Sequence, residues 1–449
     1  PSAYWAQIAT RGRGWQPWDG FVRFLSRSRV PAGLFVARRE DLDKQFDISV
    51  HDQSQAVRFR PVETSSWSFQ NDCLAKMVAA NKLGGLVLNS TGSGKTYIAG
   101  LYFKALIGSG CFIVDELTLL DQACKALSEV IGEKVGVIGA GQFCPRRITV
   151  ATVQTLHRHR QDRAFKAWTQ NLQVLFVDEV HLALNKRNIK TVQSINPPVV
   201  IGLTATLSLQ KAPVRFRAYA LAGPVLYEYP YKRGVEEKHL TQGIVIGVDL
   251  DRNVETTEGT YQESYEQYIV RSKRRNDLIE DSVRKAHELG HHIIVLVERI
   301  QHLKFLSKRL SDIPHRVVYG AKSRSFRRQA KKSFDASRIR LLIANRVFKK
   351  GVDIKQVDVM FDGASYRSRE DAMQKFGRGV RLCQGKAGLI YFDVGDTGSS
   401  PFTKATKYRR GAFRKAGIPV FKYPWAGSSK DLFRFAQKKL ESVLKKEAA

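Results

Sequence analysis

Two short segments contain the residue types that a phosphate-handling enzyme needs. The first is Asn-Ser-Thr-Gly-Ser-Gly-Lys-Thr at 89–96, and the second is Val-Asp-Glu-Val-His at 177–181. Glycines at 92 and 94 let backbone N–H groups turn towards phosphate oxygens, and a helix that begins there presents its positive N-terminal end to the same anion. The two segments together predict binding and hydrolysis of a nucleoside triphosphate.

Each polar side chain in these segments has an expected role. Lys95 reaches the β- and γ-phosphates, and the Thr96 hydroxyl binds Mg²⁺. Asp178 is expected to hold the same ion through water, and Glu179 to act as the base for the attacking water. The predicted ATP-binding loop comprises Ser90, Thr91, Gly92, Ser93, Gly94, Lys95 and Thr96.

One position departs from the usual phosphate-loop pattern, GxxxxGK[ST], because Asn89 stands where that pattern has its first glycine. The alternative interpretation is a Gly/Ser-rich turn that resembles the motif by accident. Two contexts favour the phosphate loop. An apolar run at 86–88 precedes it and a helical segment at 97–103 follows it, and the acidic pair ends a second apolar run at 174–177.

The elements that must position these residues are short apolar runs alternating with longer amphipathic stretches, a pattern typical of a parallel α/β sheet. We expect strands at 86–88, 111–114, 148–151, 174–177 and 199–203, and a second set at 293–297, 317–319, 339–343, 357–361 and 389–394. The residues at 223–231 are interpreted as a hinge. The predicted domains are 1–62, a small α+β accessory domain; 63–228; 229–424; and 425–449, a basic amphipathic helix.

The second predicted lobe carries a segment with two arginines, Gln-Lys-Phe-Gly-Arg-Gly-Val-Arg at 374–381. Arg378 and Arg381 are three residues apart, so on a helix they would share one face. As arginine fingers they would stabilise charge on the transferring phosphoryl group. The alternative is a surface helix with scattered charge.

The composition points to a polyanionic partner. Lys and Arg number 74 against 42 Asp and Glu, giving a net charge of +32 and a pI of about 10.1. Residues 321–340 hold eight basic and one acidic side chain, and residues 398–449 hold 13 and three. Either run could be a solvated helix face, but in a nucleotide-binding chain both favour phosphate contacts.

Several classes of protein are disfavoured. The five cysteines have no CxxC spacing or adjacent metal ligands, so reduced thiols and no structural zinc are expected. The longest apolar strand-like run noted, at 293–297, is far too short to span a membrane, and no targeting segment is visible, so a cytoplasmic protein is expected.

Taken in order, the segments resemble the superfamily 2 helicases and translocases over residues 67–424. The resemblance implies two RecA-like lobes, ATP and Mg²⁺ as cofactors, and a nucleic-acid strand gripped alternately by each lobe. It implies that Gln70 reads adenine, that Gly351, Asp353 and Gln374 sense the nucleotide, and that His181, Thr204 and Thr206 couple nucleotide state to movement. It also implies nucleic-acid contacts for Thr152, Gln154, Thr155 and Asn345.

A finer resemblance is to phage branch-migration helicases of the UvsW type. It is carried by Trp-Asp-Gly at 18–20, Pro-Ala-Gly-Leu at 31–34 and Thr-Lys-Tyr-Arg-Arg at 406–410. It implies a monomer that acts on forked, branched or single-stranded DNA in the cytoplasm of an infected bacterium. The alternatives are an RNA helicase, a duplex translocase of a restriction system, and a protein that binds nucleic acid under ATP control without separating strands.

Overall fold

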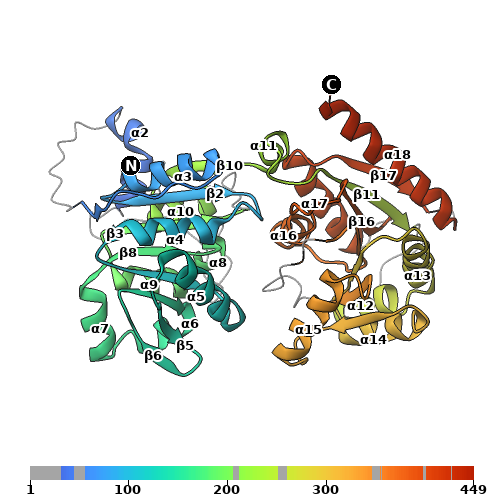
Figure 1. Cartoon of the computed structure of the whole chain (residues 1–449), viewed down its shortest axis with the longest axis horizontal. Helices are drawn as coiled ribbons and strands as arrows, with labels where there is room; N and C mark the ends of the chain where they lie inside the picture. Colours follow the sequence, from blue (N-terminus) through green and yellow to red (C-terminus); the bar gives the residue numbers. More distant parts are fainter. Residues whose placement is uncertain are drawn as a thin grey trace, which may run out of the picture. The chain divides into compact units, whose positions relative to one another are not determined.

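The computed structural model describes residues 32–44, 56–205, 212–250, 260–345, 354, 356–397, 401–425 and 427–448. They form two compact units, here called lobe 1 and lobe 2, and the chain passes from one to the other between Tyr229 and Pro230 (Figure 1). Thr206, Gly351 and Asp353 lie outside the described residues, as do the segment at 18–20 and most of the expected accessory domain at 1–62.

Lobe 1 is built on an eight-stranded sheet of order β10-β2-β9-β8-β4-β7-β5-β6. All its pairings are parallel except the β5–β6 hairpin. Five of these strands match the expected set, and Val, Ile, Leu and Phe dominate them because both faces of the sheet are covered. The strands are β2 (Gly84–Asn89), β4 (Ser109–Val114), β5 (Gly136–Gly139), β6 (Gln142–Cys144), β7 (Ile148–Thr152), β8 (Leu172–Val177), β9 (Val199–Thr204) and β10 (Val225–Tyr229).

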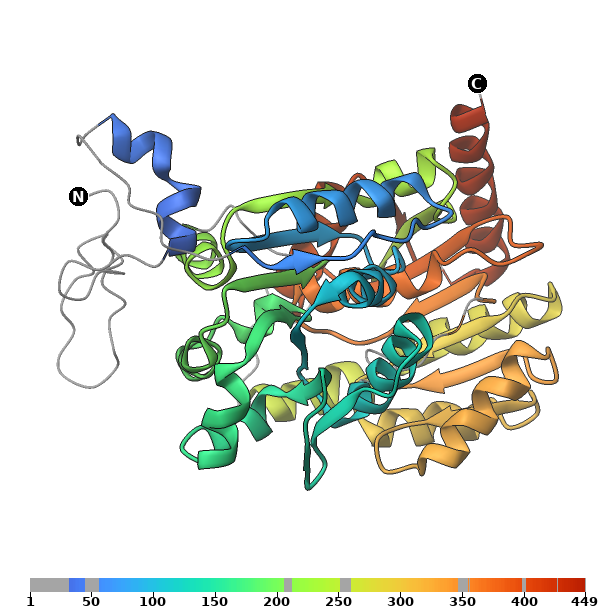
Figure 2. The same cartoon turned by 60° about the vertical axis from the view of Figure 1, so that its left-hand side comes forward.

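Alternate residues of these strands enter two different cores, as the two-residue period of a strand requires. Phe112, Val150 and Phe176 pack under one helical layer, whereas Cys111, Ala151 and Leu175 pack under the other. The first layer, seen in Figures 1 and 2, consists of α3 (Ser68–Ala79), α4 (Lys95–Ala105) and α5 (Leu117–Ile131). The second consists of α6 (Val153–His159), α7 (Arg163–Gln170), α8 (Val180–Ala183), α9 (Lys186–Ile195) and α10 (Ala212–Ala222).

The described residues before position 63 pack onto lobe 1. Val57 is buried in its core, and β1 (Arg58–Phe59) pairs with β3 (Leu106–Ile107). The Phe59 ring also meets Tyr102 edge-on at 4.9 Å. Further upstream, α1 (Ala32–Ala37) lies against α10 and is followed by α2 (Arg39–Asp43). The described end of the expected accessory domain is therefore continuous with lobe 1.

Lobe 2 repeats the architecture with a fully parallel seven-stranded sheet of order β13-β14-β12-β15-β16-β11-β17. All five strands expected here are present, within a few residues at each end. The strands are β11 (Gly243–Leu250), β12 (Ile293–Leu296), β13 (His315–Val318), β14 (Leu341–Ala344), β15 (Val359–Asp362), β16 (Leu389–Asp396) and β17 (Val420–Pro424).

Helices also cover both faces of this second sheet. One layer includes α13 (Lys273–Glu288), α14 (Ile300–Arg309) and α18 (Ser429–Ala448). The other includes α11 (Tyr231–Glu236), α15 (Arg324–Asp335), α16 (Arg369–Gly379) and α17 (Pro401–Lys415). A small separate cluster joins α12 (Tyr261–Tyr265) and the π-helical turn η2 (Glu266–Val270) to Phe402.

Two expectations about the elements need comment. The hinge interpretation is wrong for 225–229, because these residues form β10, a parallel edge strand held by β2 and by stacking of Tyr229 on Phe69 at 3.9 Å. The expected C-terminal helix is present as α18, and it lies along α13 (Figure 1). Among the described residues, no helix is long and apolar enough to cross a membrane.

Candidate functional site

The phosphate loop has the backbone that its glycines predict. Gly92 and Gly94 have φ of 93° and 79°, in the left-handed region that a Cβ disfavours. The turn begins after β2 and ends where α4 starts at Lys95. The Lys95 ammonium donates a hydrogen bond to the carbonyl of Asn89 at 2.9 Å, so the lysine side chain lies back across the mouth of this loop.

The structure accounts for the departure at position 89. The Asn89 side chain is fully buried, and its amide donates a hydrogen bond to the Cys73 sulfur on α3 at 3.6 Å. The amide thus joins the end of β2 to the first helix of lobe 1. Burial raises the pKa of the Cys73 thiol to about 12, so the sulfur stays protonated and acts only as a weak acceptor.

Gln70 lies beside the same loop. It occupies the first turn of α3 with 4% of its surface exposed. A Cβ added at Gly94 would lie 2.6 Å from its Nε2 atom, which shows how closely the amide approaches the loop. The Ser65 hydroxyl donates to the Gln70 Oε1 atom and so fixes the direction of the amide. Nothing in the sequence singled out Ser65.

The acidic pair directly follows β8. The Asp178 N–H donates to the Ile113 carbonyl at 2.9 Å, which extends the sheet ladder by one residue. Glu179 then has φ 47° and ψ 55°, a left-handed conformation that is uncommon for a side chain of this kind. This sharp turn ends the strand and directs the chain into the short helix α8. Strain of this kind persists where the surrounding structure imposes it.

A chain of hydrogen bonds connects Glu179 to the end of the neighbouring strand β9. The Thr204 hydroxyl donates to the Glu179 Oε2 atom at 3.1 Å. Its oxygen also lies 3.0 Å from the His181 Nδ1 atom, so a protonated Nδ1 donates to Thr204 in this arrangement. The structure therefore brings together Glu179, His181 and Thr204, three residues that the sequence places in two separate segments.

The charges around the pair are unequal. Burial, reinforced by the charge of Glu179, raises the pKa of Asp178 to about 7. Burial also acts to raise the pKa of Glu179, but the hydrogen bond with His181 and the charge of Lys95 outweigh it and hold that pKa below its usual value. Two adjacent carboxyl groups with one nearby ammonium suit a cation, and Thr96 in the first turn of α4 adds a hydroxyl oxygen. This donor set fits Mg²⁺.

The residues expected to grip a strand form a second group in lobe 1. Gln154 is exposed, and its amide donates to the Asp115 carbonyl at 2.8 Å, which connects the turn after β7 to the turn after β4. The Thr152 hydroxyl donates to Thr155 at 2.9 Å. Thr152 itself is 1% exposed, so it positions Thr155 and does not present its own side chain to solvent.

In lobe 2 the two arginines do not share one helix. Gln374 and Arg378 lie on α16, but this helix ends at Gly379, and Arg381 follows it in a turn. The prediction of one helical face was therefore wrong. Glycines at 377 and 379 weaken the helix, and the Thr241 hydroxyl and N–H hold the following carbonyls of Arg381 and Val380 at 3.3 and 2.8 Å.

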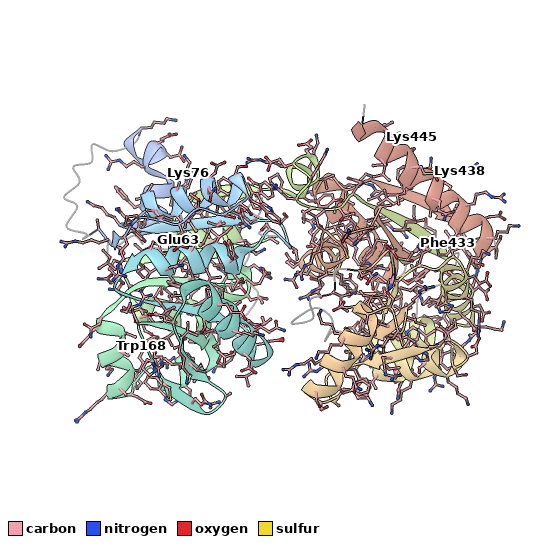
Figure 3. The ribbon with its side chains drawn as sticks, in the orientation of Figure 1. Glu63, Lys76, Trp168, Phe433, Lys438 and Lys445 are labelled. Atoms are coloured by element: carbon pink, nitrogen blue, oxygen red, sulfur yellow. The ribbon has the colours of Figure 1, made fainter. Side chains whose placement is uncertain are left out.

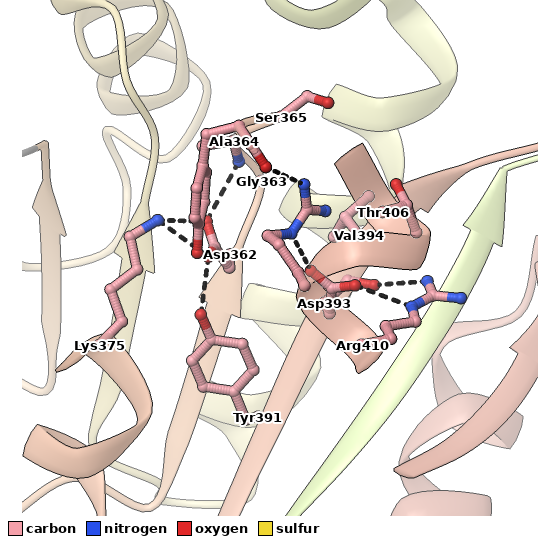
Figure 4. A network of polar contacts seen from close by, with 12 residues as sticks. Asp362, Gly363, Ala364, Ser365, Lys375, Tyr391, Asp393, Val394, Thr406 and Arg410 are labelled. Atoms are coloured by element: carbon pink, nitrogen blue, oxygen red, sulfur yellow. Dashed lines mark hydrogen bonds and ion pairs between the residues drawn. The ribbon is translucent and has the colours of Figure 1, made fainter. Parts of the chain in front are cut away.

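A buried polar network supports α16 from below (Figure 4). Asp362, at the end of β15, accepts both contacts of the Lys375 ammonium at 2.9 Å, and the hydroxyls of Tyr366 and Tyr391 at 2.7 Å. Burial would raise the pKa of Asp362, but the charge of Lys375 and other nearby donors hold it below its usual value. Lys375 is thus a positioning residue that sequence reasoning missed, although it lies beside Gln374.

Arginines of the expected basic tail join the same network. Arg409 and Arg410, both on α17, donate to the two Asp393 oxygens at 2.9 and 2.8 Å and are at most 5% exposed. They therefore stabilise the core of lobe 2 and are not available to phosphates. Asn345, a predicted nucleic-acid contact, instead lines a small hollow at the ends of the central strands, with Leu296, Val297, Glu298, Ala364, Tyr366 and Lys375.

Comparison with known proteins agrees with this division into two lobes. Residues 63–209 match the family model "Type III restriction enzyme, res subunit", and residues 274–383 match "Helicase conserved C-terminal domain". The phosphate loop and acidic pair fall in the first match, and the arginine segment falls in the second. The fold, these sites and the two matches together identify the chain as a superfamily 2 helicase or translocase, a class of ATP hydrolases.

Individual relatives are distant. The chain is 23% identical over 361 residues to irc3 of Schizosaccharomyces pombe, described as a mitochondrial ATP-dependent helicase, and the match covers 76% of this chain and 58% of irc3. It is 22% identical over 344 residues to the DNA 3'-5' translocase XPB2 of Sulfurisphaera tokodaii, covering 68% and 76%. Among solved structures, Dbp5 of S. cerevisiae bound to RNA and ADP BeF3 is 14% identical, covers 85% and 93%, and has a TM-score of 0.59.

Proposed function

We propose that this chain is an ATP-driven DNA helicase or translocase that unwinds or branch-migrates forked or junction DNA. The observation that carries the ATPase part of the proposal is the arrangement of Glu179, His181 and Thr204 beside the phosphate loop. The net charge of +32 and the translocase relative support DNA as the partner.

The chain's own groups have distinct tasks in this proposal. The loop amides and Lys95 hold the triphosphate, and Gln70 contacts its base. Glu179 accepts a proton from the attacking water, while Thr204 and His181 hold its carboxylate in place. Mg²⁺ would neutralise phosphate charge, and Thr96 and Asp178 would hold it. Arg378 and Arg381 stabilise the negative charge that develops on the transferred group.

The decisive test replaces Glu179 by Gln, which keeps the size of the side chain and removes its basicity. DNA-stimulated ATP hydrolysis should fall by about 10²- to 10⁴-fold, the usual contribution of a general base. Binding of a fluorescent ATP analogue should remain within about threefold of wild type, because the loop that holds the phosphates is unchanged. Steady-state phosphate release and equilibrium binding measure the two quantities.

Glu129→Gln is the matched control, since Glu129 is exposed on α5 of the same lobe. This variant should hydrolyse ATP at the wild-type rate. Equal turnover in Glu179→Gln and wild type would reject the assignment of the base and, with it, the proposed motor. It would favour a protein that uses ATP only as a conformational ligand.

The nucleic-acid preference requires a panel of substrates. Forked, Holliday-type and bubble DNA, and an RNA duplex, should be compared for ATP-dependent strand displacement at one stated ionic strength, because phosphate-dominated binding depends steeply on salt. Faster displacement of the forked and Holliday-type substrates would support action of the UvsW type. Displacement of the RNA duplex alone would identify an RNA helicase.

A second candidate is a duplex DNA translocase that moves without separating strands. The match of residues 63–209 to a restriction-enzyme subunit favours it. Displacement of a triplex-forming strand from duplex DNA, without release of a paired strand, would identify this activity. Action as a monomer and a location in the cytoplasm of an infected host are further parts of the proposal, and sedimentation and fractionation test them.

A further inference from the structure

The helix α18 has one face that is firmly held by lobe 2. Leu432, Phe433 and Ala436 are at most 1% exposed and belong to the same core as the strands β11 and β16. The Phe433 ring lies 5.2 Å from that of Phe392. Because these anchors recur at helical spacing, the direction of every other side chain on α18 is fixed relative to this lobe.

The opposite face of α18 carries a row of cations. Lys430, Arg434, Lys438 and Lys445 are exposed, and their spacing of four, four and seven residues places them along one side of the helix. Figure 3 shows Lys438 and Lys445 along the outer side of α18. Glu441 is the one acidic residue within this row, which we call the α18 stripe.

The charges of the α18 stripe are poorly compensated. Arg434 approaches Asp431 only to 4.0 Å, and both side chains are more than half exposed. In the described part of the chain, Lys430, Lys438 and Lys445 have no ion pair. This contrasts with Arg409 and Arg410, which the same lobe pairs with buried aspartates. Basic side chains of lobe 2 thus divide into an internal, neutralised set and an external set that lacks counter-charges.

We propose that the α18 stripe binds the phosphate backbone of a nucleic-acid duplex. This inference rests on the proposed function and extends it to a surface outside the helicase motifs. From Lys430 to Lys445 the helix rises about 22 Å, at 1.5 Å per residue. A duplex presents one phosphate every 3.4 Å along each strand, so a straight, rigid row of cations can follow it over about six base pairs.

A duplex suits this surface better than a single strand does. Proteins that hold single strands combine cations with aromatic side chains on which bases stack. The four cations of the α18 stripe have no aromatic residue among them, and the aromatic residues of the helix, Phe433 and Phe435, pack on the lobe. The stripe therefore supplies charge and direction but no surface for unpaired bases.

The test reverses three charges of the stripe together in the full chain, as Lys430→Glu, Arg434→Glu and Lys438→Glu. Affinity for a blunt DNA duplex should fall at least tenfold at about 0.1 M salt. The slope of log affinity against log salt should become shallower by about three, since each phosphate contact contributes about 0.9. Fluorescence anisotropy titrations over a series of salt concentrations measure both.

The matched control changes the net charge equally on lobe 1. Lys76→Glu, Lys125→Glu and Lys134→Glu are exposed changes on or near α3 and α5, and should alter duplex affinity by less than about threefold. Equal losses in both triple variants would show that overall charge, and not the stripe, governs binding, and would overturn the proposal. Thermal unfolding of both variants should match wild type, because none of the six side chains is buried.

A gain of function gives an independent result. Glu441→Lys completes the stripe and should tighten duplex binding about threefold and steepen its salt dependence by about one contact. Glu129→Lys, with the same change of charge on α5, should do neither. Weaker or unchanged duplex binding by Glu441→Lys would contradict the proposal.

Failure of this inference can be told apart from failure of the proposed function. ATP hydrolysis stimulated by a short single strand should stay within about twofold of wild type in the stripe variant, because the nucleotide site is untouched. Loss of duplex binding with that activity intact supports the stripe. Unchanged duplex binding with intact hydrolysis overturns the stripe alone, whereas a wild-type chain that never hydrolyses ATP overturns the proposed function. An RNA duplex assayed in parallel shows which duplex the stripe prefers.

Discussion

Glu179 holds its carboxylate on a backbone conformation that a glycine would adopt more easily. With φ of 47°, the conformation costs about 1–3 kcal/mol for a residue with a side chain. The turn places the glutamate directly after Asp178 and within hydrogen-bonding distance of Thr204 and His181. The strain is thus localised at the residue that the proposed mechanism uses as its base.

The Thr204 hydroxyl is the side chain to test at this scale. Replacing it by Ala removes its hydrogen bonds to Glu179 and His181, each worth about 1 kcal/mol, and should lower nucleic-acid-stimulated ATP hydrolysis by about tenfold. Nucleotide affinity should change by less than about twofold, because Thr204 does not belong to the phosphate loop. Thr204→Ser retains the hydroxyl and should approach wild type. Equal rates for Ala and Ser would show that the hydroxyl has no such role.

Residue types could be predicted where the local backbone demands them. Gly92 and Gly94 were recognisable because the positive φ of the loop restricts what can stand there. Ser65, which orients Gln70, and the bond between Asn89 and Cys73 could not be predicted. They depend on how α3 packs against β2, and neither serine nor cysteine signals such a partner in the sequence.

At the scale of elements, α16 is held in place by an ion pair that lies beneath it. Lys375→Met would leave Asp362 buried with only hydroxyl and N–H donors, and should destabilise lobe 2 by about 3 kcal/mol. ATP hydrolysis should also fall at temperatures well below unfolding, because Arg378 lies on the same helix, three residues beyond Lys375. Thermal unfolding and steady-state hydrolysis measure these effects.

The double variant Asp362→Leu with Lys375→Met separates stability from positioning. Replacing both partners of a buried pair by apolar groups is often neutral or stabilising, so the melting temperature should recover. If hydrolysis stays low in this stable protein, the pair positions α16. Recovery of both properties would show that Lys375 acts through stability alone.

The central strands were predictable because each is a short apolar run buried on both faces, as in β8 and β12. Edge strands were not. The edge strand β10 lies next to Gly223, Pro224 and Pro230, which read as a hinge, and β17 is a half-exposed strand with polar residues. The end of α16 was missed because its Gly377 and Gly379 were taken as parts of a motif and not as breakers of a helix.

For the whole molecule, each lobe has its own pair of hydrophobic cores. A fragment covering residues 230–448 should therefore unfold in one cooperative thermal transition, and a fragment covering 32–229 should bind ATP but hydrolyse it at least 100-fold more slowly than the full chain. Calorimetry and phosphate release provide the measurements. A lobe 2 fragment without a cooperative transition would contradict this independence.

The division into two lobes could be predicted from the two cycles of apolar runs, because the pattern records which segments must be buried. The distribution of charge could not. The basic run at 398–449 contains both the ion-paired Arg409 and Arg410 and the exposed residues of the α18 stripe. Sequence counts the two groups together, and only the packing of α17 and α18 against the sheet distinguishes them.

The anchoring of α18 has a genetic consequence. Because Leu432, Phe433 and Ala436 complete one of the cores of lobe 2, a nonsense or frameshift change within codons 429–436 would expose the apolar surfaces of β11, β16 and α13. The truncated product would be a substrate for proteases and not a shortened but working enzyme. In a screen of random mutations, such alleles should behave as complete nulls.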